Sequence, residues 1–284
     1  MKKKTEYCGY IAIVGRPNVG KSTLINEIVG NEISITSKKK NTTQKNIIGI
    51  KTKKSHQFIY IDTPGIHITK KKDIKEKQDN NLKIIKNSIL IVFIIDRTIW
   101  KIDDEIVFNK IKKNKIPIIC VINKIDKIQN KRLILPHINF LSKKINPIEI
   151  IPISAKKREN ITLLENKIYP YLPKKNHAFS KKCTTTNSLF FSISEIIRQQ
   201  LIFFLRDELL STTTVEIESL KEKIKKNLYI KAIIYVKKER QKKIIIGKKA
   251  AIIKKISMSS RFDIEKKMNM KVHLLIWVKE KIKK

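Results

Sequence analysis

Cysteine and long apolar runs are scarce in this chain of 284 residues, and each shortage excludes a class of protein. The three cysteines, Cys8, Cys120 and Cys183, have the spacing of neither a disulfide framework nor a zinc site. The longest apolar runs, such as residues 89–95, fall far short of the roughly 20 residues of a membrane-spanning helix. We therefore expect a cytoplasmic protein, with at most a peripheral association with the inner face of the cell membrane.

Acidic residues are also few, because 25 Asp and Glu stand against 63 Lys and Arg and leave a formal charge of +38. Such a charge favours a polyanionic partner, either RNA or an anionic membrane surface. Only eight of the basic residues are arginine, and lysine and isoleucine are over-used, so part of the excess fits a coding bias towards A and T. A local cluster is more informative than the total. Residues 237–255 hold nine basic residues and one acid, and we expect the RNA contact there.

The length predicts two domains, and the pattern of apolar runs agrees. Through the first 170 residues, strand-length apolar runs alternate with amphipathic stretches, which predicts an α/β domain with a mostly parallel sheet. We expect strands at residues 10–14, 47–50, 57–61, 89–95, 116–122 and 148–153, and helices at residues 22–29, 78–87, 105–113, 133–144 and 161–169.

The alternation stops at Pro170, and the polar residues that follow are typical of a linker. We expect a first domain at residues 7–172, a linker at 173–188 and a second, α+β domain at 189–284. The second domain is predicted to contain a helix at 189–210, strands at 213–224 and 228–238, a glycine-containing loop, helices through 250–267 and a strand at 272–278. The rings of Phe262 and Trp277 can stack on RNA bases, but Trp277 lies in an apolar strand and we expect it in the core.

Residues Gly15 to Ser22 read G-R-P-N-V-G-K-S and match the phosphate-binding pattern G-x-x-x-x-G-K-[ST] directly after the first strand. Glycines let the backbone N–H groups turn towards phosphate oxygens, Lys21 reaches the β and γ phosphates, and Ser22 offers a hydroxyl to Mg²⁺. Only one such loop occurs, which argues against a tandem G-protein.

Four further segments follow in the order that a GTP-binding protein needs. N-T-T-Q at residues 41–44 can place a threonine on Mg²⁺, and D-T-P-G at 62–65 supplies Asp62 for the metal and the Gly65 N–H for the γ-phosphate. N-K-I-D at 123–126 offers the Asp126 carboxylate to guanine, and S-A-K at 154–156 offers a backbone N–H to its O6 atom. Each segment alone is weak evidence, but all five in order predict GTP and GDP binding.

The predicted GTP-binding residues are Gly15, Arg16, Pro17, Asn18, Val19, Gly20, Lys21, Ser22, Thr23, Asp62, Thr63, Pro64, Gly65, Ile66, Asn123, Lys124, Ile125, Asp126, Ser154, Ala155 and Lys156. Mg²⁺ is expected on Ser22, Thr43 and Asp62, with Lys21, Thr43 and Gly65 as the catalytic residues. A glutamine follows D-x-x-G in Ras-type enzymes, whereas this chain has Ile66, so we expect slow intrinsic turnover.

These motifs, together with D-T-P-G-I-H, S-E-I-I-R, T-V-E-I-E, R-Q-K-K, I-I-G-K-K and V-H-L-L-I-W-V-K, resemble the Era family of bacterial GTPases over essentially the whole chain. The resemblance implies a P-loop GTPase domain followed by an α+β type II KH domain. It also implies a monomeric RNA-binding switch that binds 16S rRNA near its 3′ end and acts in assembly of the 30S ribosomal subunit. By resemblance, Thr43 rather than Thr42 is the metal-linked threonine. Asn18 either holds a K⁺ ion, as in related GTPases, or stabilises a turn.

The family's RNA-binding loop has the pattern G-x-x-G, whereas this chain reads Gly247-Lys248-Lys249-Ala250. Alanine suits the first turn of a helix if its φ is negative, so we expect the methyl group to hinder RNA approach more than folding. The predicted RNA-binding residues are Lys243, Gly247, Lys248, Lys249, Ala250, Lys254 and Lys255.

Two other functions stay open at this point. A tRNA-modification GTPase would carry a folate-binding domain and a helical region, neither of which is visible. A nucleotide-regulated RNA-binding module would bind GTP with negligible turnover.

Overall fold

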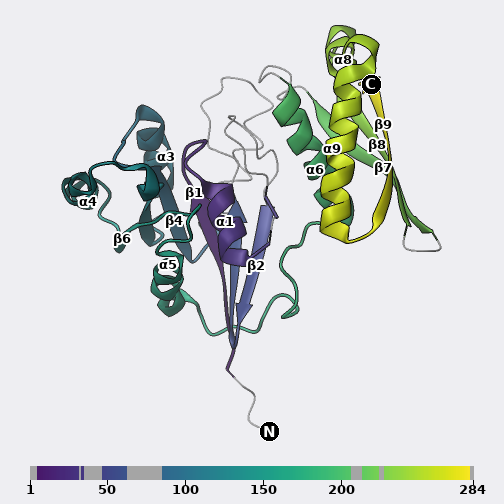
Figure 1. Cartoon of the computed structure of the whole chain (residues 1–284). Coiled ribbons are helices and arrows are strands. Elements are labelled where there is room, and N and C mark those ends of the chain that lie inside the picture. Colours follow the sequence, from purple (N-terminus) through teal and green to yellow (C-terminus); the bar gives the residue numbers. More distant parts are fainter. Residues whose placement is uncertain are drawn as a thin grey trace. The chain divides into compact units, whose positions relative to one another are not determined.

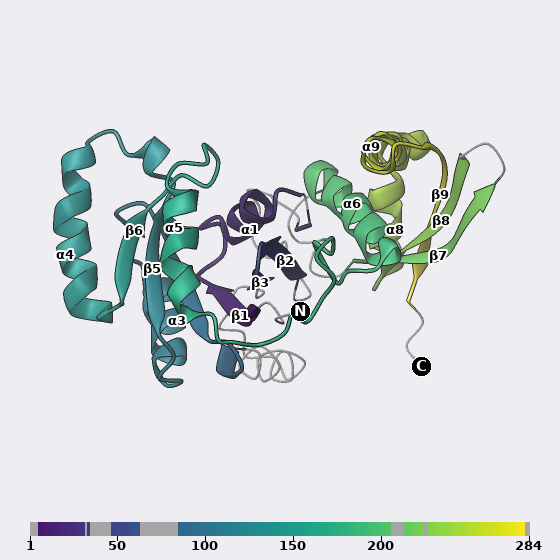
Figure 2. The ribbon, with the colours of Figure 1, turned by 90° about the horizontal axis from the view of Figure 1, so that it is seen from below.

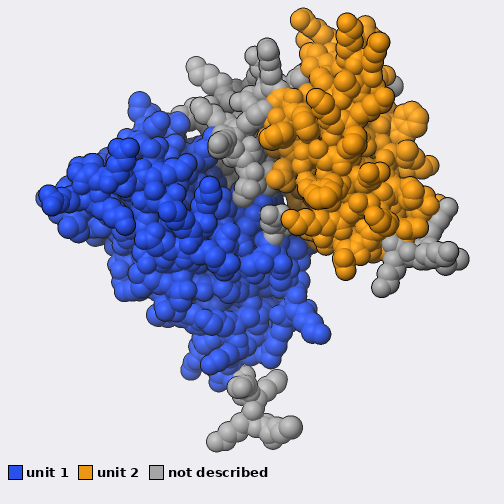
Figure 3. Space-filling model, viewed as in Figure 1, with its two compact units in different colours: residues 1–186 blue, residues 187–284 orange. Residues whose placement is uncertain are grey.

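The computed structural model describes residues 5–31, 33–34, 47–62, 85–205, 213–223 and 227–281. The chain divides into two compact units, residues 1–186 and 187–284 (Figure 3). No helix in this described part is both long and apolar enough to cross a membrane.

The first unit is built on a six-stranded sheet in the order β2-β3-β1-β4-β5-β6 (Figure 1). Only β2 runs antiparallel to its neighbour, and the other pairs are parallel. The strands are β1 (Tyr7–Val14), β2 (Ile47–Lys53), β3 (His56–Asp62), β4 (Leu90–Asp96), β5 (Ile118–Asn123) and β6 (Glu149–Pro152). The helices of its described residues are α1 (Lys21–Val29), α3 (Ile102–Lys112), α4 (Ile134–Ile145) and α5 (Ile161–Ile168).

Helices cover both faces of this sheet, which explains why β4 and β5 read as continuous apolar runs. Leu24 of α1 and Leu164 of α5 pack with Val92 in the core on one face. Phe108 of α3 and Leu141 of α4 belong to the core on the other. Strand β1 lies between β3 and β4, so the chain reverses its winding direction there. Ligands bind at such a switch point, outside the carboxyl ends of the strands.

The stretch that we expected to be a linker is hydrogen-bonded to the first unit over much of its length. Ile50 N donates to Thr184 O at 2.8 Å. The buried Gln57 side chain accepts from Phe179 N at 3.0 Å and donates to Phe179 O at 2.8 Å, so it imitates a neighbouring backbone. The first compact unit extends to Thr186, so the division between the units lies near the end of the stretch expected to be a linker.

The second unit is a three-stranded sheet in the order β7-β8-β9, and the helices of its described part lie on one face of that sheet (Figures 1 and 2). Strands β7 and β8 are antiparallel, and β8 and β9 are parallel. Its elements are α6 (Leu189–Phe204), β7 (Thr214–Lys223), β8 (Asn227–Val236), α8 (Glu239–Ile246), α9 (Ala251–Met268) and β9 (Lys271–Glu280). Ile197 of α6, Ile230 of β8 and Ile264 of α9 lie in one cluster of its core.

Two sequence-based expectations for this unit were wrong. Helix α8 occupies the place of the expected loop. At its N-terminus, the Gln241 side chain accepts hydrogen bonds from the N–H groups of Lys237 and Lys238. The buried residue of α8, Ile245, comes near the end of the helix after a run of charged residues. The sequence therefore shows no helical spacing of apolar residues here. Trp277 is 58% exposed rather than buried, because alternate residues of β9 point away from the helices.

Candidate functional site

The phosphate-binding pattern joins β1 to α1 at the switch point of the sheet. Both of its glycines are required by the space around them. A Cβ at Gly15 would lie 2.4 Å from the carbonyl oxygen of Ile94. Gly20 has a φ of +104°, and a Cβ there would lie 2.3 Å from Nδ2 of Asn123. The loop therefore fits against β4 and β5 only with glycine at these two positions.

Lys21 lies inside the curl of the loop and is 7% exposed. Its Nζ donates to Gly15 O and Arg16 O, each at 3.0 Å. Burial lowers the pKa of Lys21, although the nearby Asp62 carboxylate opposes that effect. The loop thus holds a partly desolvated cation that an anion within it would stabilise.

Asp62, the last residue of β3, is fully buried beside the loop. Its Oδ2 accepts from Ser22 Oγ at 2.8 Å and from Ser34 Oγ at 2.9 Å. Its Oδ1 is buried and has no hydrogen-bond partner among the described residues. Burial raises the pKa of Asp62, against the opposing effects of Lys21 and the two serines. An unpaired carboxylate oxygen beside a serine hydroxyl fits a hard cation such as Mg²⁺.

The Asn123 side chain connects three segments of the site and is 1% exposed. Nδ2 donates to Val19 O at 2.7 Å, while Oδ1 accepts from Lys124 N at 2.8 Å and Ala155 N at 3.0 Å. The N-K-I-D and S-A-K segments are thereby tied to the phosphate-binding loop.

The carboxylate of Asp126 is held in the same way, because Ser154 Oγ donates to its Oδ1 at 2.7 Å. Lys157 N donates to Ser154 Oγ at 3.2 Å and fixes the serine in turn. The side chain of Asp126 is only half-buried, so its remaining acceptor positions can meet a ligand.

Two acidic residues that the sequence reasoning missed hold the loop from its other side. Arg16 Nε lies 3.0 Å from Asp104 Oδ2, and its Nη2 lies 3.6 Å from Asp96 Oδ2. Lys124 Nζ also reaches Asp96 Oδ2, at 3.3 Å, and donates to Asn18 O. The sequence did offer one indication of this role for Asp96, because the residue lies at the carboxyl end of β4, beside the strand that leads into the phosphate-binding loop.

The other predicted nucleotide residues fall into two groups. Five lie in or next to the segments already described: Pro17 and Asn18 in the loop, Thr23 in α1, buried Ile125 after β5 and exposed Lys156 after Ala155. Thr43, Thr63, Pro64, Gly65 and Ile66 lie outside the described residues.

The candidate RNA loop connects α8 to α9. Gly247 has a φ of +74°, and Lys249 and Ala250 are left-handed, with φ values of +50° and +59°. Our expectation that Ala250 suits a helical first turn assumed a negative φ, and the structure contradicts it. The turn itself requires a positive φ, so the methyl group strains the backbone.

Exposed lysines surround this loop and the start of α9, namely Lys243, Lys248, Lys249, Lys254 and Lys255. Lys243 Nζ lies 3.5 Å from Glu239 Oε1 on the same helix, and this carboxylate partly offsets the charge of the lysine. The others stand close to the N-terminus of an 18-residue helix, whose dipole also favours anions.

Comparison with known proteins accounts for both units. A family model described as a 50S ribosome-binding GTPase matches residues 10–124, and a KH domain model matches residues 208–284. The GTPase Era of Buchnera aphidicola subsp. Schizaphis graminum is 76% identical over 284 residues, which is 100% of both chains. This chain belongs to the GTPase Era family. The Era of Yersinia enterocolitica is 43% identical over 276 residues, covering 97% of this chain and 91% of its own.

Solved Era structures agree over both units. Era in complex with MgGDPNP and nucleotides 1506–1542 of 16S ribosomal RNA matches with a TM-score of 0.92 and 37% identity, covering 97% of this chain and 94% of that one. An Aquifex aeolicus Era variant bound to GDP.AlF4⁻ matches with a TM-score of 0.91 over the same shares. The chain is therefore a GTPase with a P-loop domain and a KH domain, as the motifs predicted.

Proposed function

We propose that this GTPase is a nucleotide-controlled switch that binds the 3′ region of 16S rRNA and acts in assembly of the 30S subunit. The match to the Era complex with nucleotides 1506–1542 of 16S ribosomal RNA supports this RNA. The nucleotide control is supported by the Asn123 side chain, which links the phosphate loop to the two segments suited to guanine.

The roles of the nucleotide residues follow from their positions. Backbone N–H groups from Gly15 to Thr23 surround the phosphates, and Lys21 exchanges its two carbonyl partners for β- and γ-phosphate oxygens. The Asp126 carboxylate accepts two hydrogen bonds from the N1–H and 2-amino groups of guanine, a pair of donors that adenine lacks. Ala155 N is engaged by Asn123, so the O6 atom of guanine takes its hydrogen bond from a neighbouring N–H of the S-A-K segment.

The residues present fit a Mg²⁺ ion, which when bound neutralises charge on the β- and γ-phosphates. Ser22 and Asp62 would hold it, because Asp62 Oδ1 is buried without a partner in the described part of the chain and Ser22 Oγ is directed at the same carboxylate. Thr43 and Gly65 remain our predicted third metal residue and γ-phosphate donor. A K⁺ ion at Asn18 would supply the positive charge that an arginine finger supplies in other GTPases.

The switch is tested by measuring phosphate release over multiple turnovers, together with crosslinking to total RNA in GTP and in GDP. We expect slow, Mg²⁺-dependent release and preferential recovery of the 3′ end of 16S rRNA in one nucleotide state. Release limited to a single turnover would favour the nucleotide-regulated binding module instead. Equal recovery of all RNAs would leave the diffuse lysine charge as the better explanation. A monomeric state, cytoplasmic location and peripheral contact with an anionic membrane surface remain predictions.

A further inference from the structure

The three-stranded sheet of the second unit has one face packed against α6, α8 and α9, and another that no described helix covers (Figures 1 and 2). We define this second surface, the outer face, by Lys221, Tyr229, Lys231, His273, Leu275 and Trp277. Strand register places them together, since Lys221 pairs with Tyr229, Tyr229 with His273, and Lys231 with Leu275. The alternate residues Leu228, Ile230 and Ala232 lie in the core beneath the helices.

Large apolar side chains on the outer face are exposed to solvent. Trp277 is 58% exposed and Leu275 is 56% exposed. Tryptophan is among the side chains that contribute most to binding when an interface covers them. Their exposure points to a surface that binds something.

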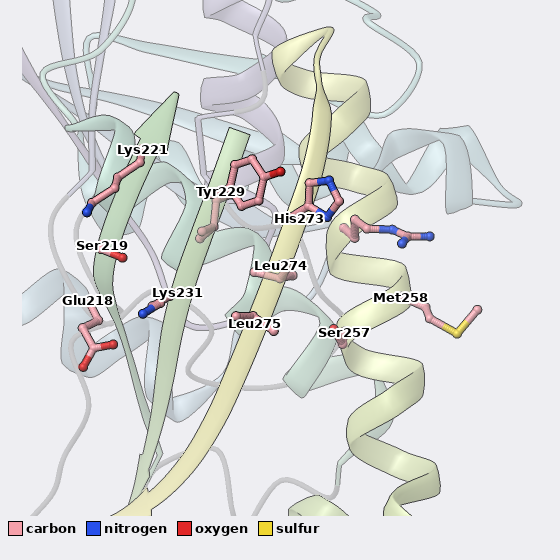
Figure 4. A pocket seen from close by; sticks show the side chains of 12 residues that line it. Glu218, Ser219, Lys221, Tyr229, Lys231, Ser257, Met258, His273, Leu274 and Leu275 are labelled. Atoms are coloured by element: carbon pink, nitrogen blue, oxygen red, sulfur yellow. The ribbon is translucent and has the colours of Figure 1, made fainter. Parts of the chain in front are cut away.

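Two rings on this face form a ready stacking platform. Tyr229 and His273 are stacked face to face, with their centroids 4.6 Å apart and their planes 15° apart, so a base can stack on the opposite face of either ring (Figure 4). Both line a pocket of about 800 Å³, whose lining also includes Lys221, Lys231 and Leu275 of the outer face, Glu218 of β7, and Ser257, Met258 and Arg261 of α9. Trp277 lies four residues beyond His273 on the same strand and the same face, roughly 13 Å away. That spacing suits two or three bases stacked along a sheet.

The charge of the face selects the kind of partner. Lys221, Lys231 and Lys279 project from it, and among the described residues none of the three forms an ion pair with a carboxylate. The acidic neighbours are Glu216 and Glu218 on β7. Aromatic rings among lysines without ion-pair partners are typical of surfaces that bind single-stranded nucleic acid. The bases stack on the rings, and the phosphates pair with the lysines. A duplex would not serve, because its bases are already stacked on one another.

We propose that the outer face is a second RNA-binding surface, separate from the Gly247–Ala250 loop, that stacks unpaired bases on Tyr229, His273 and Trp277. It would bind a single-stranded segment while the lysine-rich loop contacts phosphates elsewhere on the RNA. The inference rests on the proposed RNA-binding function but uses different residues, so each can fail alone.

The two tryptophans of the chain, Trp100 and Trp277, allow a direct test. In a Trp100→Phe variant, Trp277 is the sole fluorescent tryptophan, and a single-stranded oligouridylate of about 12 nucleotides should quench it. Tyr229→Ala with Trp277→Ala should weaken binding of that oligonucleotide at least tenfold at about 0.15 M salt. Trp277→Phe should keep most of the affinity because it keeps a ring. Phe203→Ala is the matched control, since Phe203 is 75% exposed on α6 of the same unit.

Circular dichroism establishes that each variant is folded, and Lys231→Glu should weaken binding without removing any ring. The inference is overturned if RNA does not quench the fluorescence of Trp277 and the variant with Tyr229→Ala and Trp277→Ala binds as the parent does. This holds even when Lys248→Asp with Lys249→Asp abolishes binding. That result would favour a protein as the occupant of the outer face. Failure of the unmodified chain to bind any RNA would overturn the proposed function as well as this inference.

Discussion

The Asn123 side chain donates a hydrogen bond from Nδ2 to the carbonyl oxygen of Val19, 2.7 Å away and 104 residues earlier in the chain. A residue predicted to help select the base therefore also fixes the loop predicted to bind the phosphates. Because Asn123 also accepts from Ala155 N, one buried amide sets the spacing of the whole nucleotide site.

Asn123→Ala should therefore impair the phosphate loop and the S-A-K segment as well as base selection. Val19 O and Ala155 N would lose their partners in a buried environment, which costs about 3 kcal/mol of unfolding free energy. Urea denaturation and GTP titration measure the two effects. Asn130→Ala is the control, because Asn130 accepts a single exposed hydrogen bond from Arg132 N and should cost about 1 kcal/mol or less. Normal GTP affinity in Asn123→Ala would contradict the linking role.

The order of the nucleotide motifs and the parallel sheet were predictable because both depend on short stretches of sequence. The phosphate loop, Asp62 and Asn123 each follow an apolar strand, and parallel strands bring their carboxyl ends to one edge. The ion pairs of Arg16 with Asp96 and Asp104 were not predictable, because they depend on how β4 and α3 pack beside the loop.

In the second unit, the misleading signals were local. The run V-H-L-L-I-W-V of β9 reads as a buried strand, yet only its alternate residues face the helices. The φ of Ala250 is set by the turn between α8 and α9, which the residue type does not encode.

Asp126→Asn should transfer selectivity from guanine to xanthine nucleotides, because the new amide donates where guanine also donates. Loss of hydrogen bonds to a charged group, each worth about 1.5–3 kcal/mol, predicts roughly 100-fold weaker GTP binding. Competition between GTP, XTP and ATP measures it. The amide oxygen can still accept from Ser154 Oγ, so the fold should persist. Equal competition by GTP and ATP in the unmodified protein would contradict this assignment.

His137 should make the first unit less stable in mild acid. Its Nε2 is buried without a hydrogen-bond partner among the described residues, and burial lowers its pKa below the ordinary value of 6.5. The folded state then holds the proton less tightly than the unfolded state. The stabilising effect of the neutral ring is complete above pH 6.5 and is lost as the pH falls through 6.5 towards the lower folded pKa.

In His137→Phe, the fall in melting temperature between neutral and mildly acidic pH should be smaller than in the parent. The pH dependence of the melting temperature that remains comes in part from His56. Its pKa is also lowered, mainly by burial and to a smaller extent by His177. An equal fall in His137→Phe and the parent would show that His137 keeps its ordinary pKa in the folded protein.

If Asn18 holds K⁺, GTP turnover should be faster in K⁺ than in Na⁺, and removing the side chain should abolish the difference. Asn18 has a φ of +63°, so Asn18→Gly removes the amide without straining the loop, whereas alanine would add strain. Asn146→Gly is the matched control, since Asn146 ends α4 with a φ of +51°. A salt preference that survives in Asn18→Gly would leave Asn18 with its turn-stabilising role alone.

Ala250→Gly should stabilise the second unit, and its neighbour provides the opposite control. Ala250 has a φ of +59°, where a Cβ costs about 1–2 kcal/mol, while Ala251 has a φ of −64° within the first turn of α9. Ala250→Gly should raise the unfolding free energy by about 1 kcal/mol, less than the full strain because glycine is freer in the unfolded chain. Ala251→Gly should lower it by about 1 kcal/mol.

RNA affinity adds a second readout to this pair. Glycine at position 250 removes a methyl group from the loop where an RNA backbone would approach, so binding should be equal or tighter in Ala250→Gly. Lys248 and Lys249 are exposed on the same loop and are unchanged in this variant. If denaturation shows that the unfolding free energy changes in the same direction in both glycine variants, Ala250 does not have a left-handed backbone in solution. The strain argument for this loop would then fail, whatever the RNA measurement gives.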